Sequence, residues 1–104
     1  MAMPKCKVVI RENNDVDTTA YLIKCNTKYY GVLIIDDPYY AKNSKYAYSV
    51  FNLRGTTESD AWVHLRAYWD GTLYQTTPMP KKIDRDDDKA AIAVLLYYMT
   101  KQKK

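Results

Sequence analysis

Short runs of β-branched and aromatic residues alternate with polar, turn-forming segments through the first half of the chain. The turn-forming segments are rich in Asn, Asp, Ser and Pro, which is typical of connections between strands. Between the second and third runs only the residues NTK intervene, and so short a connection indicates a β-hairpin. The pattern predicts strands at residues 5–12, 18–25, 29–36 and 45–53, with a loop over 36–44.

Residues 60–69 (DAWVHLRAYW) alternate between small aliphatic and larger aromatic or basic side chains. In a strand, one face carries Ala61, Val63, Leu65 and Ala67, and the other carries Trp62, His64, Arg66 and Tyr68. A helix is the competing interpretation, because Ala, Leu and Arg tolerate it. The Asp-Gly pair at 70–71, followed by TLYQTT, favours a hairpin. We therefore expect a strand whose small aliphatic face packs on a C-terminal helix.

The last segment, residues 84–104, predicts that helix. Acidic residues open the segment and basic residues end it, which suits the helix dipole, and Asp84 or Asp86 is expected to cap the helix. One side presents an apolar stripe and the other side is also poor in charge. The stripe comprises Ile92, Leu95, Leu96 and Met99, and the other side comprises Ala90, Ala93, Val94, Tyr97 and Tyr98. We expect Leu95 to be fully buried against the sheet.

A helix that is apolar around most of its circumference needs burial on more than one side. One side can pack on the chain's own sheet, and the same helix of a second copy is the simplest cover for the other. Alternatively, the N-terminal strands cover it within a monomer. The first explanation predicts a homodimer through residues 90–99.

Together these elements predict the α+β class, with an antiparallel sheet of about five to six strands followed by a C-terminal helix. A chain of 104 residues is long enough for one modest core, so we expect a single domain over 1–104. Within it, residues 1–44 form N-terminal strands and a loop, and residues 45–104 form the core of sheet and helix.

Composition adds a weak preference for an anionic partner. The net charge is +4 and the pI is about 9.0, and a basic balance increases attraction to nucleic acid. Tyrosine occurs 11 times against one phenylalanine, which suits surfaces that are partly apolar and partly wet.

Catalytic motifs are absent from the sequence. His64 is the only histidine, and no nucleophile elbow, P-loop or zinc-protease motif occurs. Three glycines are too few for a glycine-rich phosphate cradle. The adjacent carboxylates of Asp86, Asp87 and Asp88 point in different directions at a helix start, so capping and the helix dipole explain them better than a metal site. We expect a non-enzymatic protein without a cofactor or a bound metal.

Cys6 and Cys25 allow two states. They can pair across neighbouring strands, but free thiols are the expectation for a cytosolic protein. No apolar run approaches the length of a membrane span, and the N-terminal residues MAMPKCKVVI lack the apolar core of a signal peptide. We expect a cytoplasmic protein that does not bind membranes.

The predicted face of Trp62, His64, Arg66 and Tyr68 has a composition suited to single-stranded nucleic acid. In such sites bases stack on aromatic rings while Lys and Arg neutralise phosphates. The competing interpretation is that Trp62 and Tyr68 pack under another segment, such as residues 1–40, as large aromatic side chains usually do.

The spacing of seven residues also supports binding of single-stranded nucleic acid. These residues are Arg66, Ala67, Tyr68 and Trp69, followed by Pro78, Lys81 and Ile83. The pattern resembles the PC4 family of single-stranded DNA-binding proteins, whose second core strand ends in an arginine, a variable residue, tyrosine and tryptophan. A proline-containing linker, a lysine and an isoleucine then lead into the family's helix. The resemblance covers about forty residues, from about residue 61 to the C terminus. It implies a core of four antiparallel strands followed by a helix, with dimerisation through the helices.

The resemblance also implies which residues contact DNA. In the family, the arginine and tryptophan of the strand end contact single-stranded DNA, which carries this role to Arg66 and Trp69. Basic residues of neighbouring loops also contact DNA in the family, which implies the same role for Lys81 and for the adjacent Lys82. Strict alternation places Trp69 on the opposite face from Arg66, so a bend or bulge at the strand end is needed to bring them together.

We therefore expect sequence-tolerant binding of single-stranded DNA or RNA. Bases are expected to stack on Trp69, Trp62 and Tyr68. Phosphates are expected to contact Arg66, Lys81, Lys82 and Arg54. His64 would strengthen binding as the pH falls.

The alternative is a small phage or viral protein that binds and inhibits a host protein through a tyrosine-rich surface. Its contact residues would be Tyr29, Tyr30, Tyr39 and Tyr40. The dependence of binding on salt separates the two functions, because phosphate binding weakens steeply as salt increases.

Overall fold

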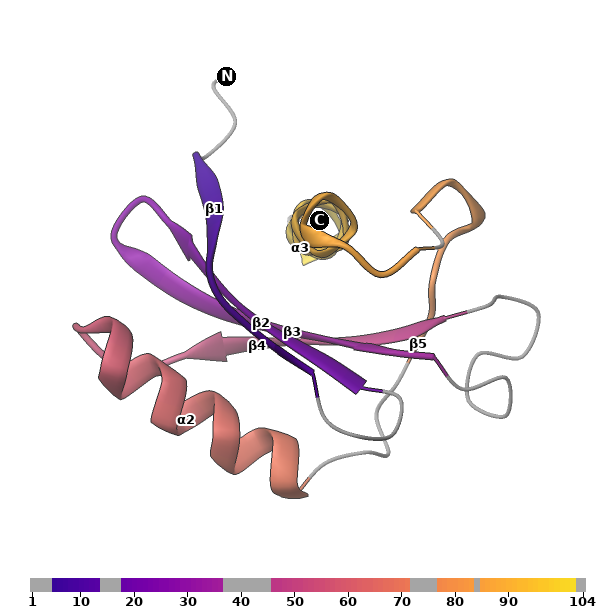
Figure 1. The fold of residues 1–104 in the computed structure, drawn as a ribbon. Helices are drawn as coiled ribbons and strands as arrows, with labels where there is room; N and C mark the ends of the chain where they lie inside the picture. Colours follow the sequence, from indigo (N-terminus) through magenta and orange to yellow (C-terminus); the bar gives the residue numbers. More distant parts are fainter. Residues whose placement is uncertain (1–4, 14–17, 37–45, 72–76, 84, 103–104) are drawn as a thin grey trace.

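The computed structural model describes residues 5–13, 18–36, 46–71, 77–83 and 85–102, and these form one sheet with a helix on each face (Figure 1). The strands are β1 (Cys6–Asn13), β2 (Thr18–Cys25), β3 (Lys28–Ile35), β4 (Ala47–Leu53) and β5 (Thr77–Pro78). The helices are α2 (Glu58–Gly71) and α3 (Asp88–Gln102), with a short 3-10 helix, η1 (Lys81–Ile83), between β5 and α3. The α+β class and the antiparallel sheet followed by a C-terminal helix are confirmed.

The sheet is an antiparallel meander in the order β1-β2-β3-β4-β5. Strands β1 to β4 lie within one or two residues of their predicted bounds, and β2 and β3 are joined by the expected tight turn at residues 26–27. Strand β5 pairs with Ala47 and Tyr48 of β4. Its second residue is Pro78, which has no amide hydrogen to donate and so suits an edge.

The strand predicted at residues 60–69 is wrong, because this segment lies within the helix α2. The buried side chains Ala61, Leu65 and Trp69 recur every fourth residue, which places them on one face of a helix. Thr57 caps the helix by accepting a hydrogen bond from the backbone N–H of Asp60 at 3.1 Å. The Asp-Gly pair at 70–71 ends α2 and does not form the turn of a hairpin.

The expected contact between this segment and the C-terminal helix is also wrong. Helix α2 lies on one face of the sheet and α3 on the other, so that β2 and β3 are enclosed from both sides (Figure 1). Within the predicted small aliphatic face, Val63 is 66 % exposed and Ala67 is exposed. The four residues of that predicted face therefore do not form one packing surface.

The cores on the two faces of the sheet are separate. On the α3 side the buried residues include Tyr21, Ile23, Val32, Ile34, Tyr48, Met79, Val94 and Leu95. On the α2 side they are Ala20, Leu22, Tyr29, Leu33, Ala61, Leu65 and Trp69. Helix α2 approaches the sheet closely at Gly31, where a β-carbon would collide with the Leu65 side chain.

The C-terminal helix is confirmed, and Leu95 is completely buried as predicted. The cap is Asp87, whose Oδ1 accepts a hydrogen bond from the backbone N–H of Ala90 at 2.7 Å. The expectation that Asp86 caps α3 is thus wrong, and Asp84 lies outside the described residues. Residues on more than one side of α3 pack within the chain, so its wide apolar surface has an intrachain explanation, and the homodimer stays a prediction.

The expectation of free thiols is also wrong, because Cys6 and Cys25 form a disulfide. The two cysteines are direct partners in the β1–β2 register, and their Cα atoms are 4.1 Å apart. The pairing joins the start of the edge strand β1 to the end of β2. Among the described residues, no helix is long and apolar enough to cross a membrane.

Candidate functional site

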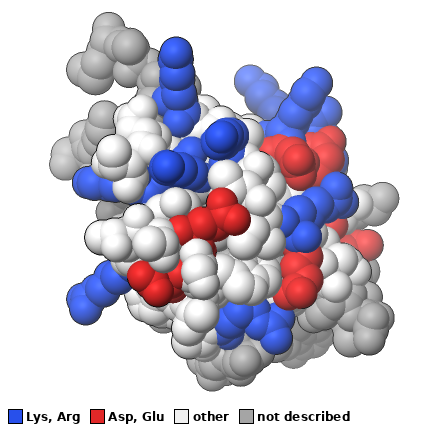
Figure 2. Space-filling model, turned by 60° about the vertical axis from the view of Figure 1, so that its left-hand side comes forward, with Lys and Arg blue, Asp and Glu red and all other residues white. Residues whose placement is uncertain are grey.

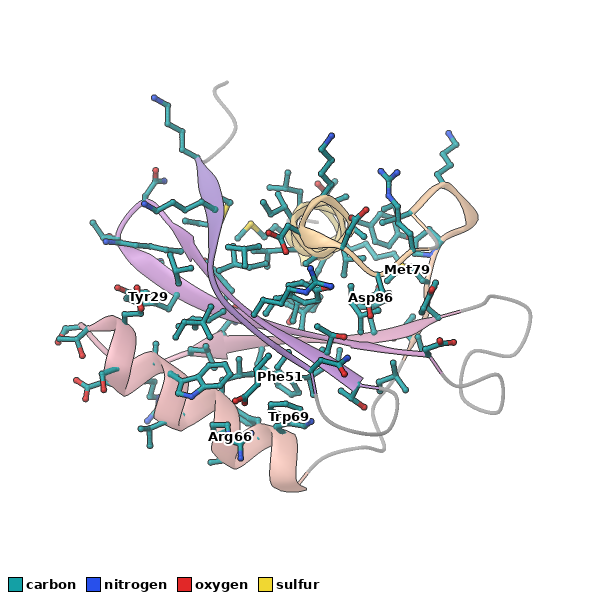
Figure 3. All side chains as sticks on the ribbon, in the orientation of Figure 1. Tyr29, Phe51, Arg66, Trp69, Met79 and Asp86 are labelled. Carbon is teal, nitrogen blue, oxygen red and sulfur yellow. A yellow bond between two sulfur atoms is a disulfide. The ribbon has the colours of Figure 1, made fainter. Side chains whose placement is uncertain are left out.

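Trp69 faces the sheet and is not available for stacking on a ligand. Its side chain is 7 % exposed and belongs to the core between α2 and the sheet. Figure 3 shows Trp69 and Phe51 between the helix and the strands. The second predicted stacking residue, Trp62, is partly buried against the same core. The expectation that the Trp69 ring is open to bases is wrong.

Tyr68 and His64 also make contacts within the chain. The Tyr68 ring stacks on Phe51 of β4, with ring centroids 4.7 Å apart and planes inclined by 14°. The His64 ring lies 4.8 Å from Tyr68, and its Nδ1 accepts a hydrogen bond from the backbone N–H of Arg54 at 2.9 Å. These side chains attach α2 to β4 and the residue after it.

Arg66 links α2 to the edge strand. Its Nη1 lies 3.0 Å from Glu12 Oε2 of β1, and its guanidinium lies 4.8 Å from the centroid of the Trp69 ring. The Arg66 and Glu12 side chains are each about half exposed, at 46 % and 49 %. An exposed ion pair of this kind contributes about 0–1 kcal/mol, so a phosphate could displace Glu12, but the Trp69 ring that Arg66 covers is buried.

The two predicted lysines before α3 belong to a segment on the other side of the sheet from α2, because Ile83 of that segment packs against the α3-side core. Lys81 and Lys82 belong to η1, in the segment that leads from β5 into α3. Lys82 is exposed there, and the Lys81 side chain lies outside the described part of the structure. The structure therefore does not bring the predicted nucleic-acid residues onto one face.

The tyrosine-rich surface of the alternative function is only partly described. Tyr29 is 7 % exposed and belongs to the α2-side core, so its expected role as an exposed contact is wrong. Tyr30 is partly buried. Tyr39 and Tyr40 lie outside the described residues.

A group of basic side chains lies at the end of the sheet where β1 and β3 begin and β2 and β4 end. We call this group the basic rim, and it comprises Lys5, Lys7, Lys24, Lys28 and Arg54. Strand pairing places these residues at one end of the sheet, on both of its faces. Lys7 opposes Lys24, which lies over Tyr29 of the α2-side core, and Lys28 opposes Cys25 of the α3-side core. Arg54 follows Leu53, which opposes Tyr29. Figure 2 shows this side of the molecule, with Lys and Arg side chains on its upper part and acidic groups beside them.

Two pockets, each of about 380 Å³, lie along the basic rim. The first is lined by Lys5, Cys6, Lys7, Lys24 and Asn26. The second is lined by Thr27, Lys28, Tyr29, Tyr30, Asn52, Leu53 and Gly55. The β2–β3 turn separates the two pockets. The first offers ammonium groups and an amide, and the second adds tyrosine side chains to one lysine.

The charges of the basic rim are not neutralised by ion pairs within the described chain. The ion pairs between described residues join Arg66 to Glu12 and Arg85 to Asp87. Lys24 instead lies over the Tyr29 ring, with its Nζ 5.7 Å from the centroid. Glu58 and Asp60 open α2 shortly after Arg54, so the five cations outnumber the nearby acids. This arrangement suits a ligand that carries phosphate groups.

Sequence reasoning missed the basic rim except for Arg54. A signal was present, since Cys6 lies between Lys5 and Lys7, and Lys24 precedes Cys25. Aligning the two cysteines across an antiparallel pair places Lys7 opposite Lys24. The expectation of free thiols removed the reason to make that alignment.

A separate polar cluster joins the segment just before α3 to β2. The Asp86 carboxylate accepts a hydrogen bond from Thr19 Oγ1 at 2.8 Å and another from the Tyr21 hydroxyl. Figure 3 shows Asp86 between the sheet and the start of α3. Burial raises the pKa of Tyr21 far above its ordinary value, and the hydrogen bond to Asp86 and that residue's charge raise it further. Because Tyr21 has no exposed surface, we assign this cluster to the stability of the fold.

Comparisons of the chain with protein-family models, with curated proteins and with solved structures found no match.

Proposed function

We propose that the chain is a non-enzymatic protein that binds single-stranded nucleic acid with little sequence preference, through the basic rim and its two pockets. The observation that carries the proposal is the row of five basic side chains along one end of the sheet, without ion-pair partners in the described chain. Lysine and arginine rows that follow a phosphate backbone supply most of the affinity in sequence-tolerant binding.

A single strand fits the two pockets better than a duplex does. Unpaired bases can enter a pocket, and the pocket lined by Tyr30 and Asn52 offers an aromatic side chain and an amide to such a base. Stacking of a base on an aromatic ring contributes about 1–3 kcal/mol. The pocket on the other side of the turn, lined by lysines, would then hold phosphate.

The proposal keeps the predicted class of ligand and changes the residues that bind it. Arg54 keeps a role in binding phosphate, whereas Trp69, Tyr68 and His64 hold α2 against the sheet. A kinship with the PC4 family stays a prediction. The residues that carry that resemblance, Arg66 to Trp69, lie in α2 rather than at a strand end. A cytoplasmic location remains part of the proposal.

Fluorescence anisotropy with a labelled oligothymidine tests the proposed function over a series of salt concentrations. Each phosphate contact to a single strand contributes a slope of about 0.7 in log K against log salt, so five contacts predict a slope of about 3.5. Replacing two cations in the variant Lys24→Gln/Lys28→Gln should lower that slope by about 1.4.

The matched control is Lys82→Gln, an exposed lysine outside the basic rim, which should bind like the wild type. Absence of binding at low salt would refute the proposal. Binding that is lost in Lys82→Gln and kept in the rim variant would instead support the residues predicted from the sequence. A tight, salt-independent complex with a host protein would favour the viral-inhibitor alternative.

A further inference from the structure

One cysteine of the disulfide lines the lysine pocket of the basic rim. Cys6 lines this pocket together with Lys5, Lys7, Lys24 and Asn26. Cys6 is partly exposed, whereas Cys25 is 4 % exposed. Cys6 is therefore the more accessible of the two cysteines.

Two of the pocket lysines are forced together by strand pairing. Lys7 and Lys24 are direct partners in the antiparallel register, one residue from the Cys6–Cys25 pair. Like charges that oppose each other across strands destabilise the pairing. The neighbouring disulfide opposes this repulsion, since it joins the same two strands covalently.

Besides the disulfide, pairing with β2 and packing against the α3-side core hold the start of β1. Among the described strands it lies at the edge of the sheet and pairs with β2, and its register shifts between Val8 and Ile10. Before Cys6, one backbone hydrogen bond joins the strands, from the Asn26 N–H to the Lys5 carbonyl at 3.2 Å. Opening the disulfide thus leaves the start of β1 held by its backbone pairing with β2 and by the packing of Val8 against the α3-side core, and the repulsion between Lys7 and Lys24 then acts against that pairing.

We infer that this pocket is the phosphate-binding subsite of the basic rim, and that it is complete only while the Cys6–Cys25 disulfide is closed. The inference rests on the proposed nucleic-acid function and adds a redox control to it. A bound phosphate group screens the repulsion between Lys7 and Lys24, so ligand and disulfide stabilise the same arrangement of β1 and β2.

The redox step is a thiol–disulfide exchange with a dithiol reductant. A thiolate of the reductant attacks the Cys6 sulfur, the bond to Cys25 breaks, and the second thiol of the reductant then releases Cys6. The protein gains two electrons and two protons, and the reductant is oxidised to its own disulfide. A cytosolic disulfide is typically transient or redox-sensing, which agrees with such a control.

Pyrophosphate and the labelled oligothymidine are the two probes of this inference. The oxidised wild type should bind pyrophosphate, and Lys7→Gln or Lys24→Gln should each weaken binding about tenfold, the usual effect of losing one charged hydrogen bond. Reduction with dithiothreitol should weaken both probes by at least that factor. Lys89→Gln, an exposed lysine on α3, is the control and should change neither.

The reduction potential supplies a second measurement that needs no variant. If the oxidised chain binds tenfold more tightly, saturating pyrophosphate must lower the potential of the disulfide by about 30 mV, because linkage is reciprocal. Titration in dithiothreitol redox buffers, with and without pyrophosphate, measures this shift. Far-UV circular dichroism of the reduced chain verifies that the sheet persists.

The outcomes separate the inference from the proposed function. If neither reduction nor the Lys7 and Lys24 variants change the affinity for oligothymidine, the inference is overturned and the proposed function is kept. Pyrophosphate binding that is lost on reduction, without any oligothymidine binding, supports the subsite and refutes the nucleic-acid function. An unchanged reduction potential at saturating pyrophosphate overturns the coupling.

Discussion

Tyr21 shows how one buried phenol makes the stability of the fold depend on pH. Its hydroxyl donates to the Asp86 carboxylate and its side chain has no exposed surface. Burial and Asp86 hold the pKa of Tyr21 above the ordinary value of 10.0. The unfolded chain therefore loses this proton at a lower pH than the folded chain does.

We predict that the free energy of unfolding falls as the pH rises above about 10. Below the unfolded pKa the contribution of Tyr21 is complete, and above it each pH unit should cost about 1.4 kcal/mol. Urea unfolding at a series of alkaline pH values measures the slope. Tyr21→Phe should reduce that slope by the contribution of one proton. An equal slope in both proteins would show that Tyr21 does not control the dependence of stability on pH.

Leu95 is the residue for which sequence and structure agree most directly. It is completely buried on the face of α3 that packs on the sheet. Leu95→Ala should lower the free energy of unfolding by about 2–5 kcal/mol, since it removes buried methyl groups and leaves a cavity. The next residue, Leu96, is only partly buried, so Leu96→Ala is a matched control that should cost less. An equal loss in both variants would mean that the buried face of α3 is wrongly assigned.

The role of Trp69 in α2 is the opposite of the role that it would have in the predicted strand. On a strand end open to a ligand, Trp69 is dispensable for folding. In α2 it fills the core between Ala61, Leu65 and the sheet, and Arg66 covers its ring. The element, rather than the residue type, thus decides between a ligand contact and a packing role.

Quenching of tryptophan fluorescence tests the position of α2 on the sheet. In the variant Trp62→Phe, the emission of Trp69 should resist iodide because its side chain is 7 % exposed. In Trp69→Phe, the partly buried Trp62 should be quenched more readily. Trp69→Ala should in addition cost about 3–5 kcal/mol of stability. Efficient quenching of Trp69 would place it on the surface and contradict this packing.

The arrangement of the complete fold bears on the homodimer. The sheet and the neighbouring segments already bury or partly bury most apolar side chains of α3, and Tyr97 is exposed on it at 37 %. We keep the dimer through residues 90–99 as a prediction. Light scattering at high micromolar concentration should give the mass of two chains, and Tyr97→Glu should return the mass of one. A monomeric wild type would show that contacts within the chain suffice for α3.

Local pattern predicted the elements whose signals agree with one another. The four longer strands carry β-branched and aromatic residues between turn-forming segments, and α3 carries acidic residues first and basic residues last. Residues 60–69 fit two periods at once, since Ala61 and Leu65 share a face in a strand and in a helix alike. In the helix, the Leu65 side chain lies against Gly31 of β3. This contact joins residues far apart in the sequence, so no local pattern can predict it.

The sequence alone determined the α+β class, the four longer strands with the β2–β3 hairpin, and the C-terminal helix with Leu95 inside, because short-range periodicity and turn chemistry encode them. The tertiary structure alone decided that α2 covers the sheet face opposite α3, that Cys6 meets Cys25, and that five cations converge on one rim. These features depend on register and on residues far apart in the chain. A one-residue slip in pairing reverses every side chain of a strand, so only the assembled sheet specifies which lysines stand together.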